Sequence, residues 1–161
     1  AHVPELVLIG LREALRLNPS SAPAHVGLGY LNERRAAYDE AFAEYERALA
    51  ADPDDPRANF RYGESLLHRF QAGWRGADFS AAGAQALIDR MRTLLGRSVA
   101  RNPTLGEAYA AFGATYLLDR VSPAAGIRVL EQARAMFASM RAAHAIAETE
   151  ALLDQATART A

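Results

Sequence analysis

An Asn-Pro or Asp-Pro pair, an alanine and a glycine recur together along this sequence. In each set the second member follows the first after 34 residues, and the third follows the second after 50. Proline and glycine are scarce, with seven and eleven copies, so three sets in common register are not expected by chance. A period of roughly 34 residues predicts repeated helix-turn-helix units. The recurring residues are Pro19, Pro53 and Pro103, then Ala24, Ala58 and Ala108, then Gly29, Gly63 and Gly113.

The recurring residue types suit helices that pack closely in pairs. A glycine inside a helix costs about 1 kcal/mol relative to alanine, and this cost is tolerable where a larger side chain would push two helices apart. The prolines mark helix ends, because proline lacks an N–H group and disfavours helical geometry in the residue before it. The large side chains expected to fill the space between paired helices are Leu28, Tyr45, Tyr62, Phe112 and Tyr116.

The stretch 22–55 resembles one complete tetratricopeptide repeat (TPR). The usual aromatic residue early in the first helix is replaced by His25, and by Asn59 in the next unit, whereas Tyr109 restores it in the third. The resemblance covers about residues 5–138. It implies an all-α fold, with antiparallel helix-turn-helix repeats stacked as a right-handed α-solenoid, and a role as a binding scaffold. The residues that match the family pattern are Ala24, Leu28, Gly29, Ala41, Tyr45, Ala48 and Pro53.

The positions of the repeats predict how a single domain over 1–161 is divided. We expect the second helix of a partial repeat at 4–20, a first repeat at 22–55, a second repeat with an enlarged hairpin at 56–105, a third repeat at 106–138, and a capping helix at 140–159. A helix alone at the N-terminal edge would expose an apolar stripe, so either further repeats precede it or this edge is a contact surface.

The third repeat and the capping helix are expected to be separated by a break near Ser139. Ser122 and Pro123 suit a helix cap and the first helical turn, so the second helix of this repeat is expected to begin there. The capping helix should turn an apolar face to the array and charged residues to water. That apolar face comprises Met140, Ala143, Ile146 and Leu153.

The second repeat is longer than the others by 16 residues, which fall between Leu67 and Ile88. We expect both of its helices to be long, with a protruding loop near 72–78 and with Asp78 or Ser80 as the cap of the next helix. Trp74, the only tryptophan, lies in this loop. It either folds back to seal the hairpin or serves as an exposed anchor for a partner, since insertions in repeat proteins gather on one face and tryptophan is favoured at interaction hot spots.

Composition excludes several classes of function. The sequence has no cysteine, and all eighteen of its basic residues are arginine, so disulfides, thiol chemistry, a Walker-A lysine and a Schiff-base lysine are excluded. The longest apolar run without charge, 108–118, is shorter than the roughly 20 residues of a membrane helix, so we expect no membrane insertion. Heavy use of alanine and arginine favours a bacterial source, in either the cytoplasm or the periplasm.

Candidate catalytic and metal motifs have simpler explanations. Gly27 and Gly29 resemble the start of a dinucleotide fingerprint, but Asn32 stands in place of the third glycine and no strand is expected before them. Glu64 and His68 share a helix face, yet one such pair supplies too few metal ligands. No zinc-protease or serine-hydrolase motif is present. We therefore expect no enzyme active site, no metal and no cofactor.

The concave face lined by the first helix of each repeat is the expected ligand-binding groove. Arg57 and Arg61, one turn apart, could hold a carboxylate, although they are equally suited to pairing with Glu64 or with acids of the first repeat. Binding of a chaperone C-terminal tail through the clamp known in some TPR domains is disfavoured, because lysine is absent and Tyr30 and Arg61 stand where the clamp has asparagine. The expected groove residues are Tyr30, Arg34, Arg57, Phe60, Arg61, Glu64 and His68.

Charge is unevenly distributed although the net charge is only −1. Residues 22–55 contain three arginines and eight acids, whereas 57–101 contain eight arginines and three acids. This division favours attraction between neighbouring repeats, and the alternative is a basic unit that binds an acidic partner. Nucleic acid is disfavoured because the domain lacks net basicity. We expect a protein or peptide partner, with self-association into a homo-oligomer or a regulatory TPR arm of a larger enzyme as the alternatives.

Overall fold

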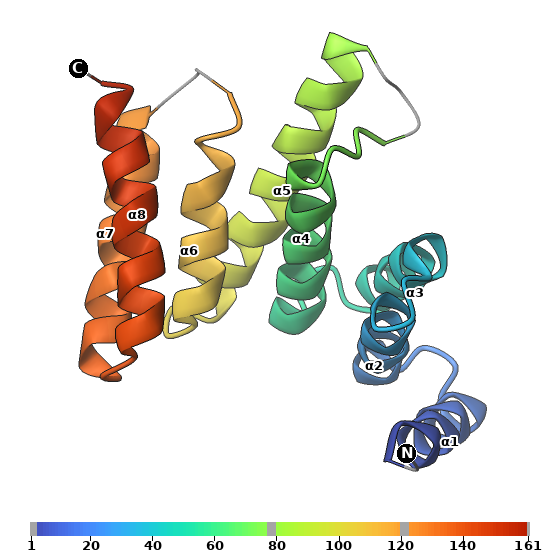
Figure 1. Cartoon of the computed structure of the whole chain (residues 1–161). Coiled ribbons are helices and arrows are strands. Elements are labelled where there is room, and N and C mark those ends of the chain that lie inside the picture. The colour runs from blue at the N-terminus through green and yellow to red at the C-terminus, as the bar shows by residue number, and fades with distance from the viewer. Residues whose placement is uncertain (1–2, 77–79, 120–122, 161) are drawn as a thin grey trace.

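The computed structural model of the chain describes residues 3–76, 80–119 and 123–160. Within these ranges the secondary structure is entirely helical, which confirms the all-α prediction. The helices follow one another in chain order across the molecule, with the two termini at opposite ends of the array (Figure 1). The helices are α1 (Val3–Leu17), α2 (Ala22–Glu33), α3 (Tyr38–Ala51), α4 (Pro56–Gln71), α5 (Ala81–Arg101), α6 (Gly106–Thr115), α7 (Pro123–Ser139) and α8 (Ala143–Ala158).

The helices pack as consecutive pairs. α2 packs on α3, α4 on α5 and α6 on α7, while α1 packs against α2 at one end and α8 against α7 at the other. The first helices of the pairs also contact one another, since α4 touches both α2 and α6. The molecule is therefore a helical-repeat solenoid whose first helices form a common surface.

Hydrogen-bonded caps fix where the helices begin. Ser21 Oγ accepts the Ala24 N–H at 3.4 Å and Asp55 Oδ1 accepts the Ala58 N–H at 2.6 Å, which satisfies donors that have no partner within the helix. Pro56 occupies the first turn of α4, where its missing N–H has no cost. Asp78 and Ser122 lie outside the described residues.

The recurring glycines allow the close helix pairing that the sequence predicts. A Cβ atom on Gly29 would lie 2.5 Å from Tyr45 Cε1, and one on Gly113 would lie 2.5 Å from Leu130 Cγ. Tyr45 and Leu130 are fully buried, so neither can move aside. Each glycine thus receives the large residue of its own partner helix, and this contact sets the distance between the helices of a pair.

Two buried polar residues replace the aromatic of the family pattern, and each joins its helix to the preceding turn. His25 lies between Glu44 Oε2, at 2.6 Å from Nδ1, and the Pro19 carbonyl, at 2.9 Å from Nε2. Asn59 Nδ2 donates to the Pro53 and Asp55 carbonyls, both at 2.9 Å. The turn carbonyls gain donors, which removes the penalty for burying them unpaired.

The second pair is larger than the first. α4 has 16 residues and α5 has 21, against 12 in α2 and 14 in α3, and the start of α5 rises above the neighbouring helices (Figure 1). Ser80 caps α5, with its Oγ accepting the Gly83 N–H at 3.0 Å. Trp74 is partly buried against the main hydrophobic cluster, with its ring centroid 5.5 Å from that of Phe42. Its ring therefore packs back onto the preceding repeat, and its role as a partner anchor stays a prediction.

The C-terminal region breaks after Ser139, where α7 ends. Met140 lies in the turn and is 63% exposed, so its assignment to the apolar face of the last helix is wrong. The break comes from Arg141, whose φ of 55° places it in the left-handed region and redirects the chain. Of the other predicted face residues, Leu153 is buried and Ala143 is exposed. α8 also buries Thr149 and Ala156, and Leu153 and Ala156 pack with Leu130.

Arginine–carboxylate pairs link the acidic first repeat to the arginine-rich second unit. Arg90 Nη2 lies 3.1 Å from Glu46 Oε1, and Arg101 pairs with Asp54. These contacts favour the interpretation that the uneven charge serves attraction between neighbouring repeats. None of the helices that the structure describes has the length and apolar character needed to cross a membrane.

Candidate functional site

Three connected hollows run along α2, α4, α6 and α8. The proline hollow, of about 480 Å³, lies between α2 and the start of α4. The arginine hollow, of about 450 Å³, lies between α2, the start of α3 and the second half of α4. The alanine hollow, of about 460 Å³, lies between α4, α6 and α8. Tyr30 and Arg61 line both of the first two, and Glu64 and His68 line both of the last two, so the hollows form one continuous groove.

The structure brings most of the predicted groove residues together. Arg57 lines the proline hollow, and five others line the arginine hollow. Tyr30 is 39% exposed although it is a large aromatic side chain, so it offers apolar area to a ligand. The Arg61 guanidinium carbon lies 5.0 Å from the centre of the Tyr30 ring. The five residues in the arginine hollow are Tyr30, Arg34, Arg61, Glu64 and His68.

Phe60 does not belong to the groove, and its prediction as a ligand-binding residue is wrong. Its side chain is 7% exposed and packs in a hydrophobic cluster with Leu95, Val99 and Ala108. α4 is flanked by α5 and α6 on the side that Phe60 faces. Arg61 is the next residue along α4, so its side chain points in a different direction around the helix axis and lines the groove.

The arginine hollow also has lining residues that sequence reasoning missed. Tyr38, Ser65 and Arg69 all line it. The Arg69 guanidinium carbon lies 4.2 Å from the centre of the Tyr38 ring and 6.0 Å from that of Trp74. Because residues four apart lie on one side of a helix, the spacing of Arg61, Ser65 and Arg69 was a usable signal.

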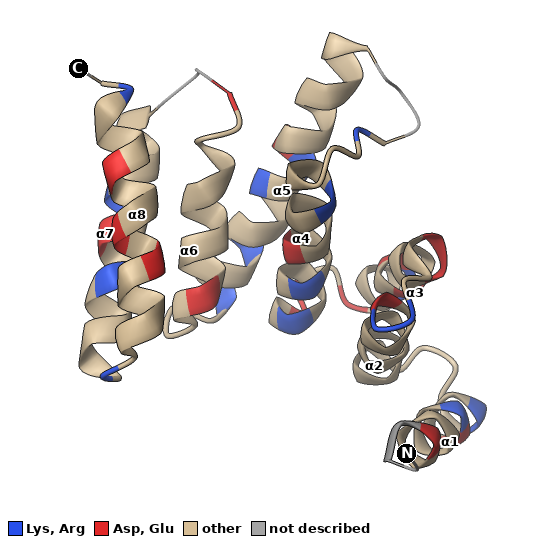
Figure 2. Cartoon of the chain, viewed as in Figure 1, with Lys and Arg blue, Asp and Glu red and all other residues tan. Residues whose placement is uncertain are grey.

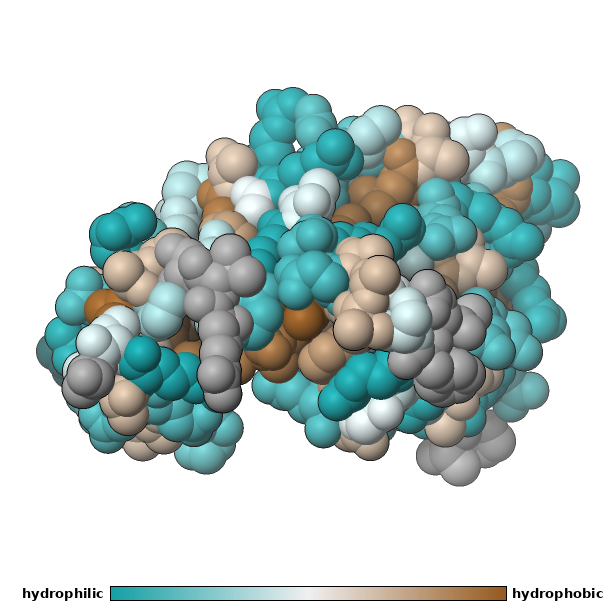
Figure 3. Space-filling view, turned by 90° about the horizontal axis from the view of Figure 1, so that it is seen from above, coloured by the Kyte–Doolittle hydropathy of each residue, from teal (hydrophilic) through white to brown (hydrophobic). Residues whose placement is uncertain are grey.

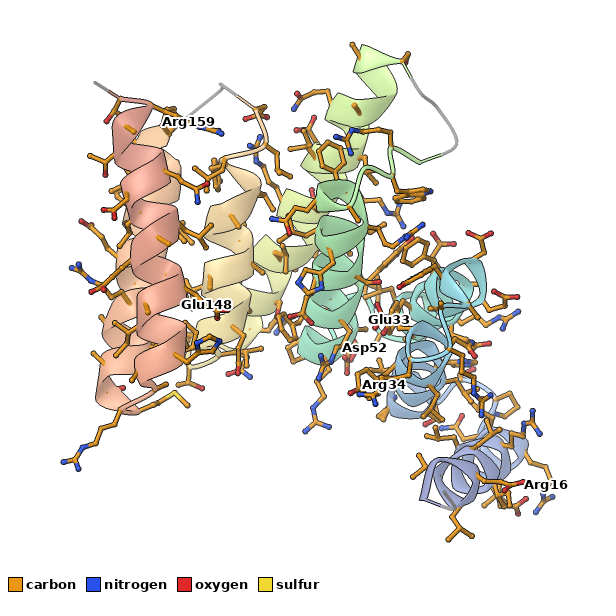
Figure 4. The ribbon with its side chains drawn as sticks, viewed as in Figure 1. Arg16, Glu33, Arg34, Asp52, Glu148 and Arg159 are labelled. Carbon is orange, nitrogen blue, oxygen red and sulfur yellow. The ribbon has the colours of Figure 1, made fainter. Side chains whose placement is uncertain are left out.

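The acidic and the arginine side chains of the groove differ in whether they have hydrogen-bond or ion-pair partners among the described residues. Glu33 accepts the Tyr45 hydroxyl at 2.8 Å, and Glu64 accepts from Arg61 at 3.2 Å. Among the described residues, Arg34, Arg57 and Arg69 form no ion pair with a carboxylate. Figure 4 shows Glu33 and Arg34 on the side of α2 that is next to α4. This part of the groove therefore has uncommitted positive charge.

Burial changes the acidity of groove residues. Desolvation raises the pKa of Glu64 above its ordinary value, and the nearby charges of Arg61 and His68 only partly oppose this shift. Desolvation also raises the pKa of Tyr45, with the charge of Glu33 acting in the same direction. Both shifts follow from the low polarity of the helix interface below the groove.

The alanine hollow has a small-residue floor and an acidic rim. Leu67 and Leu152 add apolar area to the alanines. Glu107 and Glu148 stand at its edge, and His144 lies 3.3 Å from Glu148. Red acidic positions mark the start of α6 and the face of α8 in Figure 2, whereas blue arginine positions lie on α4, and Glu148 is labelled beside α6 in Figure 4. The floor is formed by Ala110, Ala111, Ala114, Ala145 and Ala151.

The surface view agrees with this distribution of polar and apolar residues. Seen from above, the outline of the molecule is indented along one side, and hydrophobic atoms are visible there between hydrophilic ones (Figure 3). Among the described residues, no group of three His, Cys, Asp or Glu side chains is placed to hold a metal ion. The groove offers aromatic, guanidinium and apolar surface to a ligand.

Comparison with known proteins identifies the repeats. The tetratricopeptide repeat family model matches residues 11–56 and 38–70. No curated protein matches the sequence significantly. Residues 11–70 thus match tetratricopeptide repeats, and solved TPR structures share the fold of the chain through its later helices.

Solved structures show the same fold at low sequence identity. The TPR2B domain of yeast Sti1, in its pHsp70 complex, is 14% identical with a TM-score of 0.67, over 86% of this chain and 97% of that one. A thermophilic TPR protein from Thermus thermophilus is 18% identical with a TM-score of 0.66, over 94% and 77%. YrrB, described as a TPR protein with an unusual peptide-binding site, is 19% identical with a TM-score of 0.60, over 97% and 77%.

Proposed function

We propose that this chain is a non-catalytic scaffold that binds a peptide segment of a partner protein along the groove. The observation that carries the proposal is the continuity of the three hollows, which share Tyr30, Arg61, Glu64 and His68. A continuous groove suits a peptide better than a compact small molecule, because each hollow receives one part of an elongated ligand. Mediation of protein or peptide binding is the general role of the TPR fold.

The alanine hollow gives the peptide a place for an apolar side chain. Its volume of about 460 Å³ lies within the range of typical ligand pockets. Ala110 and Ala145 leave this space open because their side chains end at Cβ, and Leu67 and Leu152 supply apolar walls. Burial of a leucine or phenylalanine side chain there would contribute roughly 1.5–3 kcal/mol. The acidic rim favours a basic residue beside that apolar side chain.

Two of the similar structures support this class of function. The Sti1 domain was solved in a complex, and YrrB is described by its peptide-binding site. These statements concern those proteins, and their identities to this chain are only 14% and 19%. They favour peptide binding here without indicating a particular ligand.

Peptide selection followed by groove substitutions tests the proposal. Peptides selected from a random library on the immobilised chain would be measured by isothermal titration calorimetry on the Tyr30→Ala/Arg61→Ala variant. We expect at least a tenfold loss of affinity, because these residues line two of the hollows. The matched control is Arg97→Ala, on α5, which is exposed and lines none of the three hollows. Equal affinity for all three proteins, with circular dichroism showing each folded, would contradict the proposal.

Self-association is a second candidate function, favoured by one observation on α1. Leu6 is 68% exposed, Ile9 is 59% and Leu17 is 71%, which leaves an apolar face without a partner among the described residues. A second copy could cover it, since a Cβ atom added at Gly10 would meet nothing within 4 Å, and the bare glycine permits close approach of another helix. Sedimentation equilibrium of Leu6→Glu/Leu17→Glu against wild type would test this. A wild type that stays monomeric at every concentration contradicts it.

A further inference from the structure

We propose that the arginine hollow is an anion-recognition subsite, in which Arg69, Arg34 and Ser65 bind a carboxylate or phosphate group of the bound peptide. This inference rests on the proposed function and adds the chemical class of group that the peptide presents. The subsite differs from the Arg57–Arg61 pair, because Arg57 lines the proline hollow and Arg61, which also lines the arginine hollow, is paired with Glu64.

Aromatic rings hold the Arg69 side chain in place, and it donates no hydrogen bond to another group in the part of the chain that the structure describes. Its guanidinium carbon lies 4.2 Å from the Tyr38 ring centre and 6.0 Å from the Trp74 ring centre. Its Nε is buried and has no hydrogen-bond partner among the described residues. A guanidinium that stacks on aromatic rings keeps its planar fork of N–H donors for carboxylate or phosphate oxygens. The residue is thus oriented for an anion that the protein itself does not supply.

Ser65 supplies the second, independent observation. Its side chain is 4% exposed and lines the hollow. Among the described residues, the Oγ atom is buried without a partner, although a helical serine can usually donate to a carbonyl of the preceding turn. Leaving a buried hydroxyl unpaired costs free energy. An anion oxygen in the hollow would accept this hydroxyl and remove the cost.

The charge around the hollow also favours an anion. Three arginines and two carboxylates line it: Glu64 is paired with Arg61, and Glu33 accepts the Tyr45 hydroxyl and keeps its negative charge. Arg34 lines the hollow, is exposed and forms no ion pair among the described residues. With Arg34 and Arg69 in no ion pair among the described residues, and guanidinium groups outnumbering carboxylates by three to two, the hollow retains a net positive charge for an incoming anion.

Trp74 provides a direct readout for the test. It is the only tryptophan, and it lies on the Arg69 guanidinium and the Phe42 ring. Inorganic phosphate and acetate would be titrated separately into the whole chain, at constant ionic strength with chloride, while Trp74 emission and the ¹H–¹⁵N spectrum are followed. We expect a saturable change for at least one anion, and the tighter of the two distinguishes a phosphate from a carboxylate source.

Matched variants decide whether the response belongs to this hollow. Arg69→Gln should weaken anion binding at least tenfold, and Ser65→Ala severalfold. Arg90→Gln is the control, because Arg90 also lies over a tyrosine ring, with its guanidinium carbon 5.1 Å from the Tyr62 ring centre, but lines none of the hollows. Since Arg69→Gln changes the surroundings of Trp74, its affinity would be taken from the amide shifts of Tyr38. No saturable change in wild type, or equal binding by Arg69→Gln, would overturn the inference.

The same experiment separates failure of this inference from failure of peptide binding. The titration with small anions needs no peptide, and selected peptides would be compared with versions in which Asp, Glu or phosphoserine is replaced by Asn, Gln or Ser. Peptides that bind equally well in both versions would overturn the anion subsite and leave the proposed function standing. Anion binding with no peptide binding would overturn the peptide function and assign the hollow to a free anion.

Discussion

The arginine hollow and the alanine hollow lie on the two sides of α4, and they present opposite surfaces to a ligand. The first is lined by Tyr30, Tyr38 and arginines, whereas the second has an alanine floor and the acids Glu107 and Glu148 at its rim. Both hollows are lined by helices of the same repeated helix-turn-helix type. The packing residues repeat, as Gly29 and Gly113 show, while the groove-facing residues differ.

This difference indicates where the specificity of the molecule resides. The contacts of Gly29 with Tyr45 and of Gly113 with Leu130 are nearly identical, so they determine the distance between helices and carry no information about the ligand. Residues of the first helices that face the groove make no such packing contact. Their identity can therefore differ between repeats without changing the distance between helices. A ligand with an acidic group at one end and an apolar side chain toward the other complements both hollows at once.

The largest expected effect comes from adding a side-chain atom where the two helices of a pair are in closest contact. Gly29→Ala and Gly113→Ala each place a Cβ 2.5 Å from a fully buried side chain. The overpacking should outweigh the gain in helix propensity of about 1 kcal/mol and lower stability by roughly 1–2 kcal/mol. Urea denaturation would measure the change.

A glycine with free space around it provides the control for these two substitutions. A Cβ on Gly10 of α1 meets nothing within 4 Å. Gly10→Ala should therefore stabilise the protein by roughly 0.5–1 kcal/mol. If all three substitutions stabilised the chain, the repeated glycines would not set the distance between paired helices. The claim that both hollows are built on the same helix spacing would then be wrong.

Filling the alanine hollow should weaken ligand binding on one side of α4 and leave anion binding on the other side unchanged. Ala110→Phe places a large side chain over the floor without entering the core, since Ala110 is only partly buried. Affinity for a selected peptide with an apolar anchor should fall about tenfold, or about 1.4 kcal/mol. Phosphate or acetate binding in the arginine hollow should stay unchanged. Equal loss of peptide and anion binding would show that the hollows do not act as separate subsites.

Glu64 lies between the two hollows, and its acidity predicts a pH effect. Burial raises the folded-state pKa of Glu64 above its ordinary 4.5, so the folded protein holds this proton more tightly than the unfolded chain. The resulting stabilisation is present below pH 4.5 and is lost as the pH rises through the folded-state pKa. Relative to wild type, Glu64→Gln should therefore become more stable as the pH rises through this window. Glu148→Gln is the control, because the Glu148 side chain is 66% exposed, and a parallel trend there would refute the assignment to burial.

The smallest expected effects come from the turns at the two ends of the groove. Ala36, between α2 and α3, has a φ of 58°, and Arg141, between α7 and α8, has a φ of 55°. Residues with a Cβ pay roughly 1–2 kcal/mol in this region, partly offset by the greater freedom of glycine in the unfolded chain. Ala36→Gly and Arg141→Gly should each raise stability by about 0.5 kcal/mol. A lower melting temperature for either would show that its side chain makes a compensating contact.

Much of the fold follows from local signals in the sequence. The second repeat is predicted to begin at residue 56, where α4 begins, and a break is predicted near Ser139, where α7 ends. These boundaries depend on proline, caps and helical periodicity, which act within a few residues. Gly29 and Gly113 were informative because only a close contact with a partner helix justifies glycine at those positions.

The site was less predictable because it depends on how helices flank one another. Phe60 and Arg61 are neighbours in the sequence, and only the packing of α4 between α5 and α6 decides that Phe60 is buried. The stacking of Arg69 on Tyr38 joins two different repeats, so no spacing within one helix reveals its partner. The partly buried position of Trp74 likewise depends on its contact with Phe42 of the preceding repeat.

Site-directed photo-crosslinking tests the central claim, that the groove binds a partner peptide, most directly. A benzophenone amino acid would replace Tyr30, Ala110 or Arg97 in turn, and each protein would be irradiated with the same selected peptide. Our account predicts crosslinks from positions 30 and 110, which line the groove, and none from position 97 on α5. Crosslinking from position 97 alone would show that the partner binds outside the groove, and would contradict the account.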